Sequence, residues 1–165
     1  MTPVHFHLML NHVAIMAALF SSVIFIAGMF RKNETVKNIA LYGFILSAIV
    51  AIPVFLTGEP SEDAVENLPG VLKNVIEAHE DAAAFAVWMI GAAGIFSLMS
   101  LMMKKVQWFR SASFSMVMAL IAVVSAGSIS YTGYLGGKIR HTEIAGNVQL
   151  QNAVEMQGGE TEEDD

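Results

Sequence analysis

Four long apolar stretches limit what this chain can fold into. They run roughly from Leu8 to Phe30, from Ile39 to Leu56, from Ala82 to Met103 and from Ser113 to Leu135. An α-helix needs about 20 apolar residues to cross the hydrocarbon core of a bilayer. The sequence therefore predicts an all-α fold, in which four transmembrane helices form an up-down-up-down bundle within residues 1–146.

The composition agrees with a membrane protein. The chain of 165 residues is 55% hydrophobic and only 15% charged, whereas soluble domains carry about 25% charged residues. It contains no cysteine, which excludes disulfides, thiolate metal ligands and covalently attached c-type heme. Residues 147–165 are polar and acidic, and we expect them to form a mobile external tail.

Charged residues are divided unequally between the two ends of the predicted helices. Fourteen of the 15 acidic residues lie in the segment Gly58 to Asp81 or in the tail after Gly137. Six of the nine Lys and Arg residues lie in the connections after the first and third stretches: Arg31, Lys32, Lys37, Lys104, Lys105 and Arg110. By the positive-inside rule these connections face the cytoplasm. Both termini are then on the outer side, and no nucleic-acid partner is expected.

The segment before the third stretch contains a short helical pattern. Val71, Leu72, Val75 and Ile76 recur at the spacing of an amphipathic helix, so we expect a short outer helix leading into the third span. Near the end of the second stretch, Pro53 predicts a kink or an early unwinding, because proline lacks the N–H that a helix interior requires.

All five histidines fall at the predicted outer ends of the spans: His5, His7, His12, His79 and His141. Imidazoles gathered at one depth of an apolar bundle need partners and often mark a metal or heme site. Their shared position predicts that a cofactor site, if there is one, lies at the outer face.

His12 and His79 are the favoured pair of metal ligands. His12 lies about one turn inside the first span, and His79 opens the third span beside a run of alanines. In a sequentially wound bundle the first and third helices are parallel and diagonal, so the two rings would face each other at similar depth. Such a pair can supply both axial ligands of heme b. Taken alone, each ring also fits a hydrogen-bonded interfacial histidine, and that alternative stays open.

Four more residues are candidates for cofactor binding. His7 and His141 are reserve ligands or hydrogen-bond donors to the ligands. Arg140 can pair with heme propionates or anchor the helix at the interface. Gly133 belongs to the fourth stretch, whose many small residues permit close approach of either a neighbouring helix or a flat macrocycle.

Other kinds of site have weaker support in the sequence. The histidines and the acidic residues around His79 could form a non-heme metal site, but no repeated Glu-x-x-His motif is present. Most of the 11 methionines lie inside the spans, where methionine is an ordinary packing residue rather than a copper ligand. No phosphate loop, nucleophile triad or zinc-protease motif occurs. No catalytic residue is therefore predicted, and enzymatic activity stays open.

The segment His7-Leu-Met-Leu-Asn-His12-Val-Ala-Ile resembles the opening of the DUF2231-like family, predicted bacterial four-span membrane proteins of unknown function. Their first helix begins His-Pro-x-x-x-His-Phe-Pro, and both prolines are absent here. Later family motifs correspond to Thr57-Gly58, His79 and Gly133-Tyr134-Leu135-Gly136-Gly137, so that the resemblance covers about residues 5–144. The family is similar to small b-type cytochromes, which implies heme b and the bacterial inner membrane.

Together these features predict a membrane-bound b-type cytochrome that transfers electrons at the periplasmic face through a bis-histidine heme. A quinol or a periplasmic redox protein is the expected partner, and the chain can belong to a larger respiratory complex. Two alternatives stay open. One is a non-catalytic accessory subunit of such a complex, and the other is a membrane protein that binds non-heme copper or iron.

The charge distribution predicts the position of the carboxyl terminus. An alkaline phosphatase fused after Asp165 should be active and a fluorescent protein fused there should be dark, because the basic connections hold the opposite ends of the helices in the cytoplasm. The reverse pattern would contradict the shared outer position of the histidines.

Overall fold

The computed structural model describes residues 3–64, 66, 71 and 73–140. Every regular element in these residues is a helix: α1 (Pro3–Phe30), α2 (Glu34–Leu56), α3 (Gly58–Glu62), α4 (Lys73–Met102), the 3-10 helix η1 (Gln107–Arg110) and α5 (Ala112–Arg140). The predicted tail, residues 147–165, lies outside the described residues.

Four of these helices are long and apolar enough to cross a membrane. α1, α2, α4 and α5 contain 28, 23, 30 and 29 residues, and about 20 residues suffice to span a bilayer. The predicted all-α fold is confirmed, as is the prediction of four helices that can span a membrane. Each helix begins before its predicted apolar stretch, by one turn or more in α1, α2 and α4.

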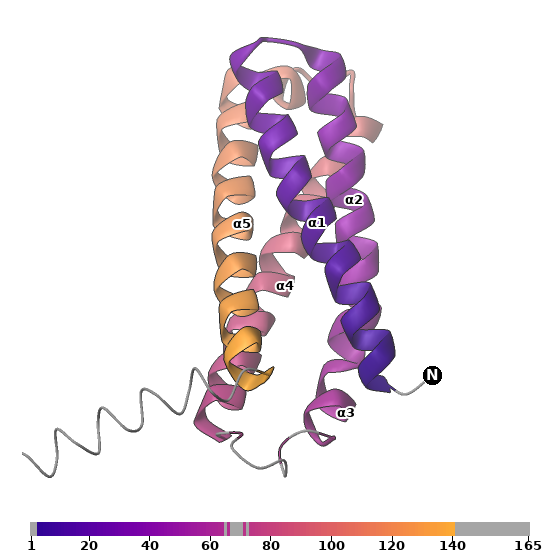
Figure 1. Ribbon diagram of the computed structural model, residues 1–165. Helices are drawn as coiled ribbons and strands as arrows, with labels where there is room; N and C mark the ends of the chain where they lie inside the picture. Colours follow the sequence, from indigo (N-terminus) through magenta and orange to yellow (C-terminus); the bar gives the residue numbers. More distant parts are fainter. Residues whose placement is uncertain (1–2, 65, 67–70, 72, 141–165) are drawn as a thin grey trace, which may run out of the picture.

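The four long helices lie side by side in one bundle (Figure 1). α1 packs against α2 and α5, and α4 packs against the same two helices. α1 and α4 therefore lie across one diagonal of the bundle, and α2 and α5 lie across the other. The contact between α1 and α2 is the most extensive and that between α1 and α5 the least, and in Figure 1 α1 and α5 diverge toward the lower end.

A tight turn joins α1 to α2 at the upper end of Figure 1. The Asn33 N–H donates to the Gly28 carbonyl at 2.9 Å, and Lys32 has a left-handed backbone with φ of 51°. These features are typical of a Schellman motif, which uses the free carbonyls at a helix end. The Asn33 side chain then accepts the Val36 N–H at 3.1 Å, so it caps the first turn of α2.

Small side chains line the contacts between the long helices, and large apolar side chains point outward. The almost fully buried residues include Ala14, Ala18, Ser47, Ala93 and Ala122. The exposed ones include Phe20, Val23, Trp88, Ile95 and Met102. This distribution suits helices surrounded by lipid, where hydrophobic burial does not drive association and small residues let backbones approach closely.

Buried serine hydroxyls add hydrogen bonds between helices. Ser22 Oγ of α1 donates to the Ala122 carbonyl of α5 at 3.1 Å, and Ser47 Oγ of α2 donates to the Ala14 carbonyl of α1 at 2.8 Å. A hydroxyl in an apolar interior has no bulk water to bond with. These bonds satisfy the donors and connect α1 to both of its neighbours.

The core differs between the two ends of the bundle. Near η1 it consists of large side chains: Phe25, Phe44, Phe109, Phe114 and Met118. Farther from η1 it is built mainly of small side chains with two isoleucines: Ala18, Ala51, Ala86, Ile90 and Ile129. At the η1 end, large side chains therefore fill the space between the helices. Toward the opposite end, the helices lie close together and small side chains suffice.

Two local expectations concern the outer segment. Of the run expected to form a short amphipathic helix, Val75 and Ile76 lie in the first turn of α4, which begins at Lys73. Val71 is not helical, and Leu72 lies outside the described residues. A separate five-residue helix, α3, precedes α4. α2 continues through Pro53 and ends at Leu56. The helix thus ends soon after the proline, and the Thr57 N–H donates to the Pro53 carbonyl at 3.1 Å.

Gly94 marks a very close approach of α4 to α2. A Cβ atom at position 94 would overlap the Ala48 Cβ and lie 3.4 Å from the Phe44 carbonyl oxygen. Neither a backbone carbonyl nor an alanine Cβ can rotate away, so any side chain here must push the two helices apart.

We expect Gly94→Ala to lower the free energy of unfolding by about 1–3 kcal/mol, the usual cost of overpacking a close contact. Gly91→Ala on the same helix is the control, because a Cβ there meets no heavy atom within 4 Å and alanine favours the helix. Thermal unfolding in one detergent measures both variants. Equal melting temperatures would contradict the tight α2–α4 contact.

Candidate cofactor site

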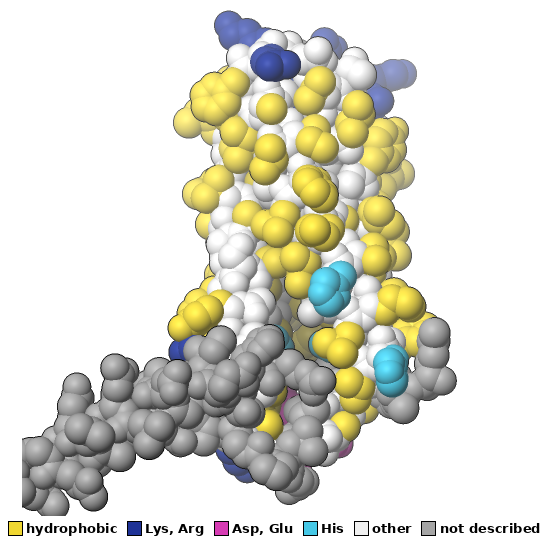
Figure 2. All heavy atoms as spheres, viewed as in Figure 1, with side chains coloured by type: hydrophobic (Ala, Val, Ile, Leu, Met, Phe, Trp, Pro, Cys, Tyr) yellow, Lys and Arg dark blue, Asp and Glu magenta, His cyan; other side chains and the backbone are white. Residues whose placement is uncertain are grey.

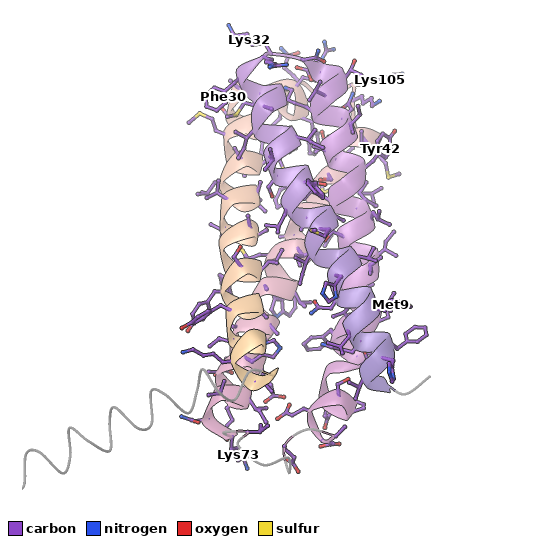
Figure 3. All side chains as sticks on the ribbon, viewed as in Figure 1. Met9, Phe30, Lys32, Tyr42, Lys73 and Lys105 are labelled. Carbon is purple, nitrogen blue, oxygen red and sulfur yellow. The ribbon has the colours of Figure 1, made fainter. Side chains whose placement is uncertain are left out.

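The two ends of the bundle differ in chemistry. Figure 2 shows several Lys and Arg side chains at the upper end and histidines in the lower part, and in Figure 3 Lys32 and Lys105 lie at the upper end and Lys73 at the lower. Of the four described histidines, His7 and His79 are half-buried, and His5 and His12 are exposed. The two half-buried rings are the basis of the candidate site.

His7 connects α1 to the end of α2. Its Nδ1 lies 3.0 Å from the Val54 carbonyl oxygen and 3.3 Å from Thr57 Oγ1. The Val54 carbonyl belongs to the last turn of α2, where carbonyls lack the usual partner within the helix. Since a carbonyl can only accept, Nδ1 carries the proton and donates to it.

His79 makes the matching contact between α4 and α5. Its Nδ1 lies 3.0 Å from the Thr132 carbonyl oxygen of α5, to which it donates. Gly136 permits this approach, because a Cβ there would lie 3.2 Å from the ring Cε1 and 3.4 Å from Nδ1. The ring therefore sits against a stretch of helix backbone that carries no side chain.

The two imidazoles share one arrangement on diagonal helices. Each donates from Nδ1 to a backbone carbonyl of the next helix, and the tautomer this requires leaves Nε2 unprotonated. Within the described residues neither Nε2 has a hydrogen-bond partner. A carbonyl on one ring nitrogen and a free second nitrogen is the usual state of a histidine that binds metal.

His12, which the sequence favoured as a ligand with His79, lies elsewhere. It is exposed, and its Nδ1 donates to the Leu8 carbonyl of its own helix at 2.5 Å. The structure thus brings His7, the predicted reserve ligand, to the interior with His79, and it turns His12 toward the outer surface of α1. His5 is also exposed.

The other predicted residues are placed less centrally. Gly133 is exposed, and a Cβ there would meet no heavy atom within 4 Å, so Gly136 is the glycine that touches a histidine. Arg140 is the last residue of α5. His141 lies outside the described residues.

The sequence contains a signal that distinguishes His7 from His12. The small or large residues of α1 that become buried follow a seven-residue spacing, Ala14 to Ser21 and Ala18 to Phe25. Counting back seven residues from Ala14 reaches His7, whereas His12 lies 140° from His7 around the helix and belongs to neither row. A spacing near 3.5 residues is what keeps one face of a helix toward its neighbours in a bundle. His79 and the buried residues Ala86 and Ala93 follow the same rule in α4.

A pair of carboxyl groups lies next to this site. Glu62 of α3 is hydrogen-bonded to Glu80, the residue after His79. Two carboxyl groups bond in this way only when one of them keeps its proton. That bond, together with partial loss of solvent and the charges of Glu80, Asp63 and Glu66, raises the pKa of Glu62 to about 7.

Among residues 3–64, 66, 71 and 73–140 no three His, Asp or Glu side chains gather closely enough to hold a metal ion. The two interior histidines are a smaller set of ligands. They fit a prosthetic group that brings most of its own ligands, such as heme, better than a bare ion, which takes four or more.

Comparison with protein-family models, curated proteins and solved structures gives no match for this chain.

The raised pKa of Glu62 predicts a pH dependence. A carboxyl whose pKa is about 7 when folded, against 4.5 otherwise, stabilises the fold while it is protonated, and this contribution is lost as pH rises through that interval. We expect the melting temperature in detergent to fall between about pH 5 and pH 8, and Glu62→Gln to weaken that fall because an amide donates at every pH. Glu59→Gln, which removes the same charge from α3, is the control. An unchanged pH dependence in Glu62→Gln would contradict the shared proton.

Proposed function

We propose that this protein is a membrane-bound b-type cytochrome in which His7 and His79 hold heme b near the outer face of a bacterial inner membrane. Heme b, when bound, supplies a one-electron redox centre. The chain crosses the membrane up-down-up-down with both termini in the periplasm, and its basic turns face the cytoplasm. A quinol or a periplasmic redox protein exchanges electrons with it, alone or within a larger respiratory complex.

One observation carries this proposal. Two half-buried imidazoles on diagonal helices each donate from Nδ1 to a neighbouring backbone carbonyl, both at 3.0 Å. These bonds fix the ring orientation and the tautomer, and they raise the basicity of Nε2. Each bond also joins two helices. What favours a shared ligand is that two rings on diagonal helices, at the same end of the bundle, are held in the same way.

The residues around the rings have supporting roles. Gly136 leaves space beside His79, and at Gly58 a Cβ would lie 4.0 Å from Cε1 of His7. Thr57 Oγ1 donates to the Pro53 carbonyl at 2.7 Å, so its lone pairs remain available to the Nδ1–H of His7. These contacts position the imidazoles and limit their rotation, which is what ligand preorganisation requires.

The absorption spectrum of the detergent-purified, dithionite-reduced protein tests the proposal. We expect a b-type α band in the wild type and its loss in His7→Ala and in His79→Ala, because each removes one axial ligand. Gly136→Ala should weaken heme binding about tenfold or more, as displaced ligand orientation usually does, and Gly133→Ala should leave it unchanged.

His12→Ala is the matched control for His7→Ala, since it removes an exposed histidine from the same helix. Loss of heme in His12→Ala with retention in His7→Ala would favour the pair predicted by the sequence. A wild-type protein that folds but never takes up heme would favour the alternatives, an accessory subunit or a non-heme copper or iron protein, and metal analysis would distinguish these two.

A further inference from the structure

A groove of about 670 Å³ lies between α4 and α5 on the outside of the bundle. Small residues line it, namely Ala78 and Ala82 of α4 and Gly127 of α5. Phe85 and Tyr131 also line it, and both are more than half exposed. The groove lies at the outer end of the third span and extends along its apolar part, so a molecule with a polar head and an apolar tail fits its position.

The groove also carries polar groups that a lipid tail cannot use. Asp81 and Ser128 contribute to its lining together with the Tyr131 side chain. Ser128 Oγ donates to the Ser125 carbonyl, so its lone pairs remain available as acceptors. Asp81 is exposed, and the described residues provide it with no hydrogen bond or ion pair. The groove thus offers a carboxylate and two hydroxyls beside two aromatic rings.

The groove lies directly behind the histidine site. Ala78 flanks His79 on one side in the sequence, and Asp81 follows two residues later. On α5, Tyr131 precedes Thr132, whose carbonyl accepts from His79. The groove and the histidine site therefore use neighbouring residues of the same turns of α4 and α5.

We propose that this groove binds the head group of an isoprenoid quinone. A flat ring fits between Phe85 and Tyr131 over a floor of small residues, and its hydroxyl or carbonyl groups match Asp81, Ser128 and Tyr131. A phospholipid phosphate would be repelled by the Asp81 carboxylate. The choice of a redox lipid rests partly on the proposed electron transfer, whereas the groove and its polar groups do not depend on heme.

The two tryptophans provide a direct assay. Trp88 lies seven residues after Asp81 on α4, which places it on the same face of the helix, and it is largely exposed. Trp108 lies in η1, at the other end of the bundle. In Trp108→Phe protein the fluorescence comes from Trp88 alone. Titration with decylubiquinone should then quench it saturably, and Trp88→Phe protein should show only linear quenching.

Gly127→Leu in the Trp108→Phe background tests the groove itself. A Cβ at Gly127 meets no heavy atom within 4 Å, so the leucine enters the groove and leaves the bundle intact. We expect saturable quenching to disappear. Gly91→Leu, which also enters open space but does not line the groove, should bind normally. Asp81→Asn should weaken binding about tenfold, since it removes a charged acceptor.

Three results would overturn the proposal. The first is binding of decylubiquinone by Gly127→Leu as tightly as by the wild type. The second is full displacement of the quinone by excess phospholipid, which would identify the groove as an ordinary lipid site. The third is conversion of a dimer into a monomer by Gly127→Leu, which would identify the groove as a contact between two copies of this chain. Quinone titrations of protein with heme and of protein without heme distinguish failure of the groove proposal from failure of the cytochrome proposal. Saturable quenching in protein that takes up no heme would support the groove and contradict the cytochrome.

Discussion

Close backbone contact is the constraint on which this bundle depends. Lipid tails are as apolar as leucine, so burial of large side chains does not hold membrane helices together. Contact at van der Waals distance replaces it, and Gly94 against Ala48 is the closest example between α2 and α4. The same rule explains why alanine and serine line most of the interior away from η1, and why Trp88 and Phe20 can point outward.

Several polar side chains of this interior bond to carbonyls of neighbouring helices, because no bulk water reaches them. Ser22 and Ser47 use carbonyls of neighbouring helices, and the histidines do the same. His7 joins α1 to α2, and His79 joins α4 to α5. Each imidazole therefore strengthens one pair of helices. Among the four neighbouring pairs of long helices, α1 and α5 have the least extensive contact. A group bound by both Nε2 atoms would connect the α1–α2 pair to the α4–α5 pair and so add a link between α1 and α5.

α4 and α5 present different chemistry on their two sides. His79 and Gly136 face the interior, where their fit to each other leaves no room for a methyl group without displacement. Asp81 and Gly127 line the outer groove, and a Cβ added at Gly127 meets no heavy atom within 4 Å. The interior face and the outer groove use different residues of the same helical turns. A substitution in the groove can therefore be made without altering the contact between His79 and Gly136. Glu62 and Glu80 add a protonatable link between α3 and α4 at the same end.

The apolar stretches by themselves determined that the chain is helical and that four helices can span a membrane, because length and hydropathy alone decide whether a helix suits a bilayer. The positions of the histidines also follow from sequence, since all lie near predicted helix ends. The choice between His7 and His12 did not follow from sequence, because the seven-residue spacing that links His7 to Ala14 and Ser21 is recognised only when the burial of those two residues is known. Five residues correspond to 140° around a helix, so only the packing of α1 against α2 decided which ring meets a carbonyl. The contact between His79 and Gly136 likewise needed the tertiary structure, because it depends on the depth at which two helices, far apart in the sequence, come to lie side by side.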